Sequence, residues 1–221
     1  MAADAVEEAP VIKAQSRKEL LTLLAPALGK AGFHSEKTGD WDGAFAKAFE
    51  GGRQTVHINL SGSGDELRCV IQFATTHDLV EEIYEGICGR RSSVGGAKWS
   101  LFFALSDMLG EGINWKYPLP TNADIRSLVS LLEAKAMPIL ERCLALEDLD
   151  ALIQVDGVFP TRTERRFATL IVARLAGNPH FEDLAEAFRL RFEKYKYSQE
   201  VTDKLRQLVT YLRESVGPVA E

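Results

Sequence analysis

The sequence has few cysteines and no long apolar run. Its three cysteines, Cys69, Cys88 and Cys143, are odd in number and widely spaced, so they predict buried free thiols rather than a disulfide framework or a metal site. Free thiols fit a reducing compartment. No run approaches the roughly 18 apolar residues of a membrane helix, and no basic segment followed by an apolar one marks a secretory signal. We therefore expect a cytoplasmic protein that contacts no membrane.

The chain also has too little positive charge for a general nucleic-acid binder. Its 221 residues include 26 Lys and Arg against 32 Asp and Glu, a net charge of −6, whereas phosphate binding needs a basic face. The charge is uneven, because residues 1–154 carry 15 basic and 22 acidic residues and residues 155–221 carry 11 and 10. We expect no nucleic-acid partner, and an acidic surface in the first part that favours a basic protein.

Catalytic and metal-binding motifs are missing as well. In the Gly-rich stretch 89–98, Lys98 is followed by Trp99, where a phosphate-binding P-loop needs Ser or Thr. No two histidines have the close spacing of a metal-ligand pair, and the Gly-x-Ser-x-Gly pattern of a nucleophile elbow does not occur. We therefore assign no catalytic residue, no metal and no cofactor. A site assembled from residues far apart in the chain stays open.

Three apolar runs separated by Gly-rich turns predict an antiparallel meander around which the chain is organised. The runs are 44–49, 54–60 and 67–73. The middle run alternates with the period of a sheet that has one covered face. Its faces carry Val56, Ile58 and Leu60 on one side, and Thr55, His57 and Asn59 on the other. A further apolar run at 99–105 predicts a fourth strand, and a helix that continues through Leu109 is the alternative.

Helical periodicity predicts helices before and after the meander in the sequence. Ser16 and Glu19 form a capping-box pattern that opens the first helix, and Gly29 or Gly32 ends it. Later helices are expected over 78–87, 121–138, 146–153, 161–175, 181–192 and 198–216, and Pro138 should bend or end its helix. The predicted fold class is α+β, an antiparallel sheet of about four strands flanked by helices, with an all-helical C-terminal segment.

The composition divides the chain into three parts. Residues 1–12 are small and acidic and predict a flexible tail. Residues 13–154 contain the strand patterns and form the expected α+β domain. The stretch 156–160 has Gly157 and Pro160 and marks a boundary. Beyond it, residues 155–221 predict a helical segment that packs on that domain.

Four carboxylates recur at helical spacing in the helix expected at 78–87. They are Asp78, Glu81, Glu82 and Glu85. One interpretation is a solvated helix face, with acids near the N-terminus where the helix dipole favours them. The other is a docking surface that attracts a basic protein partner.

His57 and Asn59 form the second candidate site, on the polar face of a central strand. His57 is placed to contact a small molecule or to act as a base there, and a structural hydrogen bond is the alternative. Four aromatic residues could together line a groove or belong to the core. They are Trp41, Trp99, Trp115 and Tyr117.

Several short motifs together resemble a bacterial family of unknown function. They are Gly32-Phe33, the strand residues 56–59, Lys98-Trp99, the helix end 136–141, and the stretch 146–149. The family has Leu-Gly-Phe where this chain has Ala31-Gly32-Phe33, and a leucine where it has Met137. The resemblance spans about residues 17–153.

The resemblance implies a small α+β protein, of the kind found as immunity or accessory factors beside bacterial toxins. It brings no catalytic residues. We therefore expect a non-catalytic protein-binding domain, with an immunity-type inhibitor of a bacterial toxin as one form. The alternative is a small-molecule-binding module or enzyme that uses the polar sheet face around His57. A structural subunit of a larger assembly is a third possibility.

Overall fold

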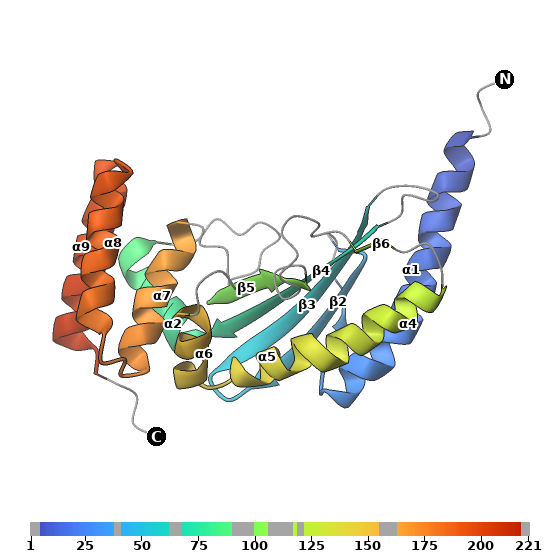
Figure 1. Ribbon diagram of the computed structural model, residues 1–221, viewed down its shortest axis with the longest axis horizontal. Helices are drawn as coiled ribbons and strands as arrows, with labels where there is room; N and C mark the ends of the chain where they lie inside the picture. Colours follow the sequence, from blue (N-terminus) through green and yellow to red (C-terminus); the bar gives the residue numbers. More distant parts are fainter. Residues whose placement is uncertain are drawn as a thin grey trace. The chain divides into compact units, whose positions relative to one another are not determined.

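The structure is a computed structural model that describes residues 5–37, 41–61, 68–89, 100–105, 117–118, 122–154 and 163–217. The described part has the α+β fold that the sequence predicts (Figure 1). The chain divides into two compact units. Unit 1 comprises Met1–Ala74 and Phe102–Glu141, and unit 2 comprises Thr75–Leu101 and Arg142–Glu221.

The described strands form one antiparallel sheet in the order β1-β2-β3-β4-β5, with β6 paired to β4. They are β1 (His34–Glu36), β2 (Gly43–Phe49), β3 (Gly52–Ser61), β4 (Arg68–His77), β5 (Leu101–Ala104) and β6 (Tyr117–Pro118). The predicted meander and the strand at 99–105 are confirmed. Strands β1 and β6 were not predicted, because β1 is exposed and polar and β6 has two residues.

Cross-strand register assigns the side chains of β2 and β3 to two faces. Phe45 pairs with Val56 on one face, and Ala44 pairs with His57 on the other. The Phe45 face packs against α1 (Ala5–Lys30). A Cβ at Gly43 would overlap the end of the Leu21 side chain of that helix, so any larger residue there requires Leu21 to shift.

The helices of unit 1 begin earlier and run further than the sequence patterns predict. Helix α1 begins at Ala5, so residues 5–12 have a helical backbone, and the flexibility of the tail stays a prediction. Seven of residues 5–15 are Ala, Glu, Lys or Gln, which propagate a helix well, and the helix continues across Pro10. Ser16 therefore lies inside the helix and does not cap it.

A long helical stretch follows in three parts, and it continues through Pro138. These parts are α4 (Asn122–Leu131), the π-helix η3 (Leu132–Ala136) and α5 (Met137–Arg142). Proline has no N–H to donate to the preceding turn. The wider π turn, in which the Met137 N–H donates to Leu132 O, comes just before it. Pro138 therefore neither ends the helix nor stops α5 from reaching Arg142.

The end of α5 meets a buried glutamine from the sheet. The last carbonyls of a helix have no intrahelical donor. Gln54, which is fully buried on β3, donates from Nε2 to Leu140 O at 2.5 Å. Its partner across the strand pair, Lys47, forms an ion pair with Glu141 at 3.5 Å. The Phe45 face of the sheet therefore holds α5 by its C-terminal end, on the side where α1 also lies (Figure 1).

Unit 2 is built around a helix that is buried on all sides. Helix α7 (Thr163–Leu175) has four successive residues, 170–173, with no exposed surface, and such a helix needs neighbours all round. It contacts α2 (Asp78–Cys88), α6 (Leu146–Gln154), α8 (Phe181–Lys194) and α9 (Gln199–Ser215).

The two units do not divide the chain where the composition suggested. Helices α2 and α6 come before the expected boundary, yet they belong to unit 2. The reason is that both bury apolar side chains against α7, and Tyr84 of α2 contacts Phe167 at a ring distance of 6.2 Å. The boundary motif at 156–160 itself lies outside the described residues.

Two predicted helix signals in unit 2 are present. Ser198 caps α9, its Oγ accepting from the Val201 N–H at 3.4 Å. Gly177 ends the turn after α7 with a φ of +66°, and the Asn178 N–H donates to Ala173 O at 2.9 Å.

We predict that Gln54→Met destabilises the protein by about 1–3 kcal/mol, because Leu140 O loses its donor in a buried position. Lys47→Met, one strand away on the same face, should change the free energy of unfolding by less than about 1 kcal/mol, since its ion pair is partly solvated. Urea denaturation of the two variants measures both values. Equal effects would show that the glutamine does not hold the end of α5.

Candidate functional site

The acidic face of α2 is smaller than the sequence predicts. Asp78 and Glu82 are exposed and Glu85 is half-buried, but Glu81 is only 4% exposed. Including Glu81 in the docking surface was therefore wrong. Glu81 lies one helical turn from Tyr84 on the inner face of α2, so the spacing that joined it to the other acids also turns it towards the core.

Buried Glu81 belongs to a hydrogen-bond network at the start of α2. Ser100 Oγ donates to Glu81 Oε1 at 3.1 Å and accepts from the His77 N–H at 2.9 Å. His77 is also buried, and its Nε2 lies 2.9 Å from Cys143 O, beyond the end of α5. A carbonyl only accepts, so this nitrogen carries the proton. Both polar side chains therefore serve the fold of unit 2.

Exposed Glu82 lines an apolar groove, which we call the α2 groove. Its volume is about 540 Å³, and it lies along α2 and the end of α9. Its α2 side is lined by Leu79, Glu82, Ile83, Gly86 and Ile87, and its other side by Leu175, Tyr211, Ser215, Val216 and Gly217. The groove combines an apolar floor with negative charge at its edge.

Two residues give the α2 groove its form. Leu79 is 43% exposed, which is unusual for a large apolar side chain in this chain. Gly86 lies inside α2, and a Cβ there would meet no atom within 4 Å. Because glycine costs a helix about 1 kcal/mol relative to alanine, the open space at Gly86 comes at the expense of helix stability.

The second candidate site lies on the sheet face that carries His57. The register places Glu36, Ala44 and His57 in one row across β1, β2 and β3. Because side chains alternate along a strand, Asn59 lies on the same face, and it is half-buried. The structure therefore keeps His57 and Asn59 together, as predicted, on the face opposite Gln54.

His57 has an unusual environment for a buried histidine. It is 5% exposed, and its ring lies 4.8 Å from that of Trp41. Neither ring nitrogen has a hydrogen-bond partner in the described part of the chain. The structural hydrogen bond considered for this residue is therefore not formed. Burial lowers the pKa of His57, with the charge of Arg53 acting in the same direction and Glu36 opposing it.

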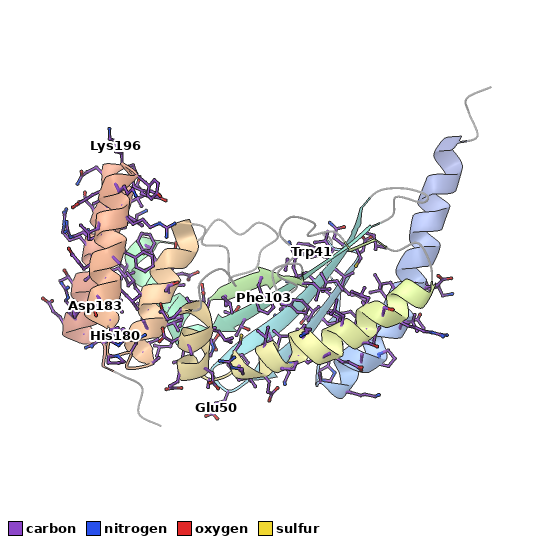
Figure 2. The ribbon with its side chains drawn as sticks, in the orientation of Figure 1. Trp41, Glu50, Phe103, His180, Asp183 and Lys196 are labelled. Atoms are coloured by element: carbon purple, nitrogen blue, oxygen red, sulfur yellow. The ribbon has the colours of Figure 1, made fainter. Side chains whose placement is uncertain are left out.

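A pocket of about 460 Å³, which we call the hairpin pocket, opens beside this row between α1 and the β1–β2 hairpin. Its apolar side is lined by Leu21, Ala25, Gly43, Ala44 and Phe45, and its polar side by Ser35, Glu36, Lys37, Trp41 and Asp42. Trp41 therefore belongs both to the pocket wall and to the stack on His57. It lies beside the strands in Figure 2.

Sequence reasoning named His57 but missed three residues beside it. Glu36, Trp41 and Asp42 fall in or next to the polar run that precedes the meander, and no periodicity marks them. The sequence predicts Trp41 only as a residue of a groove or of the core. In the structure Trp41 is half-buried and its ring packs on that of His57, so it is neither fully in the core nor only in a groove wall. Only the pairing of β1 with β2 brings the three residues to one place.

The three cysteines are free and buried, as predicted. Burial raises the pKa of the Cys69 and Cys143 thiols to about 12 in each case, so both are protonated at neutral pH. Within the described ranges, no group of three His, Cys, Asp or Glu side chains is arranged to hold a metal ion. The Gly-rich loop considered as a phosphate site lies almost wholly outside those ranges.

Comparison of the chain with protein-family models, with curated proteins and with solved structures finds no match. The resemblance noted in the sequence thus stays a prediction. None of the described helices is both long enough and apolar enough to cross a membrane.

We predict that Glu81→Lys and Glu82→Lys differ strongly in their effect on stability. The first places an opposite charge in a buried network and should cost about 3 kcal/mol or more. The second changes an exposed position and should stay within about 0.5 kcal/mol. Chemical denaturation of both variants checks this, and similar values would contradict the burial of Glu81.

The two buried histidines predict a loss of stability in mild acid. Burial lowers the pKa of both His57 and His77 below 6.5 in the folded state. Well above pH 6.5 both histidines are neutral in the folded and in the unfolded protein. Below it the unfolded state binds protons first, so stability falls as the pH drops from 6.5 towards the folded pKa values, by at most about 1.4 kcal/mol per pH unit for each histidine.

Urea denaturation at pH 7.5, 6.5 and 5.5 measures this effect. His77→Gln and His57→Gln should each reduce the dependence on pH, because each removes one proton-binding group. A free energy of unfolding that does not change over this range would contradict the buried, neutral state of both rings.

Proposed function

We propose that this chain is a non-catalytic protein-binding domain, and that unit 2 holds a basic, amphipathic segment of a partner protein in the α2 groove. The single observation that carries the proposal is exposed Leu79 at the edge of that groove. An exposed apolar side chain beside an apolar groove favours contact with another protein.

The charges beside the groove indicate the kind of partner. Asp78 and Glu82 are exposed on the same helix as Leu79, and negative charge at the edge of an interface attracts and orients basic partners. An amphipathic helix that places apolar side chains in a groove and Lys or Arg at its edge matches this arrangement.

An immunity-type inhibitor, in which the bound partner is a toxin, is one form of this function and rests on the sequence resemblance. We also propose that the protein acts in the cytoplasm, which the free thiols of Cys69, Cys88 and Cys143 support. Neither proposal needs a catalytic residue.

Two designed peptides of equal length test the groove directly, one with Leu and Lys and one with Leu and Glu on an amphipathic helix. Calorimetric titration should show binding of the Lys peptide, weakened by salt. The Glu peptide should bind at least about tenfold more weakly, a difference of about 1.4 kcal/mol. Equal affinity for the two peptides would contradict the proposal.

Two substitutions at Gly86 separate the groove from the rest of the surface. Gly86→Phe should fill the open space and weaken the Lys peptide about tenfold or more. Gly86→Ala leaves most of the space open, so it should keep the affinity and raise stability by about 0.5–1 kcal/mol. A peptide that binds Gly86→Phe as well as the unchanged protein occupies another site.

The role of the acids is tested by reversing Asp78 and Glu82 to Lys, with Glu147→Lys and Asp148→Lys on α6 as the control of equal charge change in the same unit. We expect the first variant to lose most of its affinity for the Lys peptide and the control to keep it, because Glu82 lines the groove and Asp78 precedes the groove residue Leu79 on α2. Loss in both variants would indicate attraction by net charge alone.

A further inference from the structure

A second site lies in unit 1 and is independent of the α2 groove. The hairpin pocket provides the space, and the Asp42 carboxylate and the Trp41 indole in its wall provide the polar and aromatic groups. We propose that the hairpin pocket binds a small primary amine that carries an apolar group, with the ammonium beside Asp42 and Trp41 and the apolar group against Leu21 and Phe45.

The size and walls of the pocket fit a small molecule. Ligand sites have volumes of about 300–1,000 Å³ and are mostly apolar with a few placed polar groups, and this pocket has about 460 Å³. Its apolar wall comes from Leu21 and Ala25 of α1 and Phe45 of β2. A short hydrocarbon group on this wall would lose contact with water, which is favourable.

The polar wall favours a cation. Asp42 is half-buried, and its Oδ2 accepts from the Leu60 N–H at 2.7 Å, which holds the carboxylate in place. Glu36 also lines the pocket and is paired with Arg53. Lys37 adds a positive charge, but it is exposed and water screens it more than it screens Asp42. The fixed negative charge therefore dominates.

Trp41 gives the pocket its selectivity for an amine over other donors. The face of an indole ring is the best aromatic partner for a cation, and Trp41 lies next to Asp42 in the pocket wall. An ammonium with three N–H donors can bind a carboxylate and lie over the ring at the same time.

His57 reports on the pocket through Trp41. The His57 ring lies 4.8 Å from the ring of Trp41, and Trp41 lines the pocket. An ammonium over the Trp41 ring therefore changes the electrostatic surroundings of the His57 ring.

Three probes that share one phenyl group and differ in the head group test the proposal on the full chain. They are 2-phenylethylamine, 3-phenylpropionate and 2-phenylethanol. Calorimetric titration at neutral pH should show the amine binding at least about tenfold tighter than the other two. The His57 ring signals, assigned by comparison with His57→Gln, should shift in nuclear magnetic resonance spectra with the amine only.

Variants locate the probe in the hairpin pocket. Asp42→Asn should weaken the amine about tenfold, and Trp41→Leu should weaken it as well. Glu50→Gln, at the exposed tip of the β2–β3 hairpin (Figure 2), is the matched control and should leave binding unchanged. Thermal melting of each variant confirms that it is folded.

Several outcomes would overturn the proposal. They are tighter or equal binding of the acid or the alcohol, unchanged His57 signals at saturating amine, equal affinity in Asp42→Asn and Glu50→Gln, and no binding of the amine at millimolar concentration. None of these results bears on the α2 groove, because that groove lies in unit 2 and is tested with peptides.

Discussion

The end of helix α5 is the constraint on which the described fold depends most. A helix leaves its last carbonyls without donors. Leu140 O accepts from the buried side chain of Gln54, and Cys143 O, just beyond the helix, accepts from that of His77. Each donor lies on a strand, β3 for Gln54 and β4 for His77. Since a buried unpaired carbonyl is costly, the chain must leave the helix where the strands provide these donors.

The same constraint explains two features that look unrelated. The π turn before Pro138 allows the helix to continue past a residue that has no N–H, and without it α5 would not reach Leu140. Burial of His77 for this contact lowers its pKa and keeps the ring neutral at physiological pH. His77 would otherwise be a candidate acid or base, but its ring forms a structural hydrogen bond within unit 2.

The two candidate sites follow one physical rule. In each, a residue with a minimal side chain leaves space beside an aromatic or apolar side chain and a carboxylate. Gly86 does this in the α2 groove, beside Leu79 and Glu82, and Ala44 does it in the hairpin pocket, beside Trp41. Both sites thus lie where a small residue leaves the space beside it unfilled. The first is suited to a partner segment and the second to a small cation.

The sequence by itself determined the elements that depend on local periodicity and turn chemistry. The meander, helix α2 and the Ser198 cap all follow from spacing within a few residues, because alternation and capping are local effects. It also placed His57 and Asn59 on one face. Tertiary structure alone decided which charged and aromatic groups meet. Glu81 meets Ser100 on the inner side of α2. The ring of Trp41 contacts that of His57, and Glu36 lies in the same cross-strand row as His57. Both follow from the register in which the strands pair, which no single segment encodes.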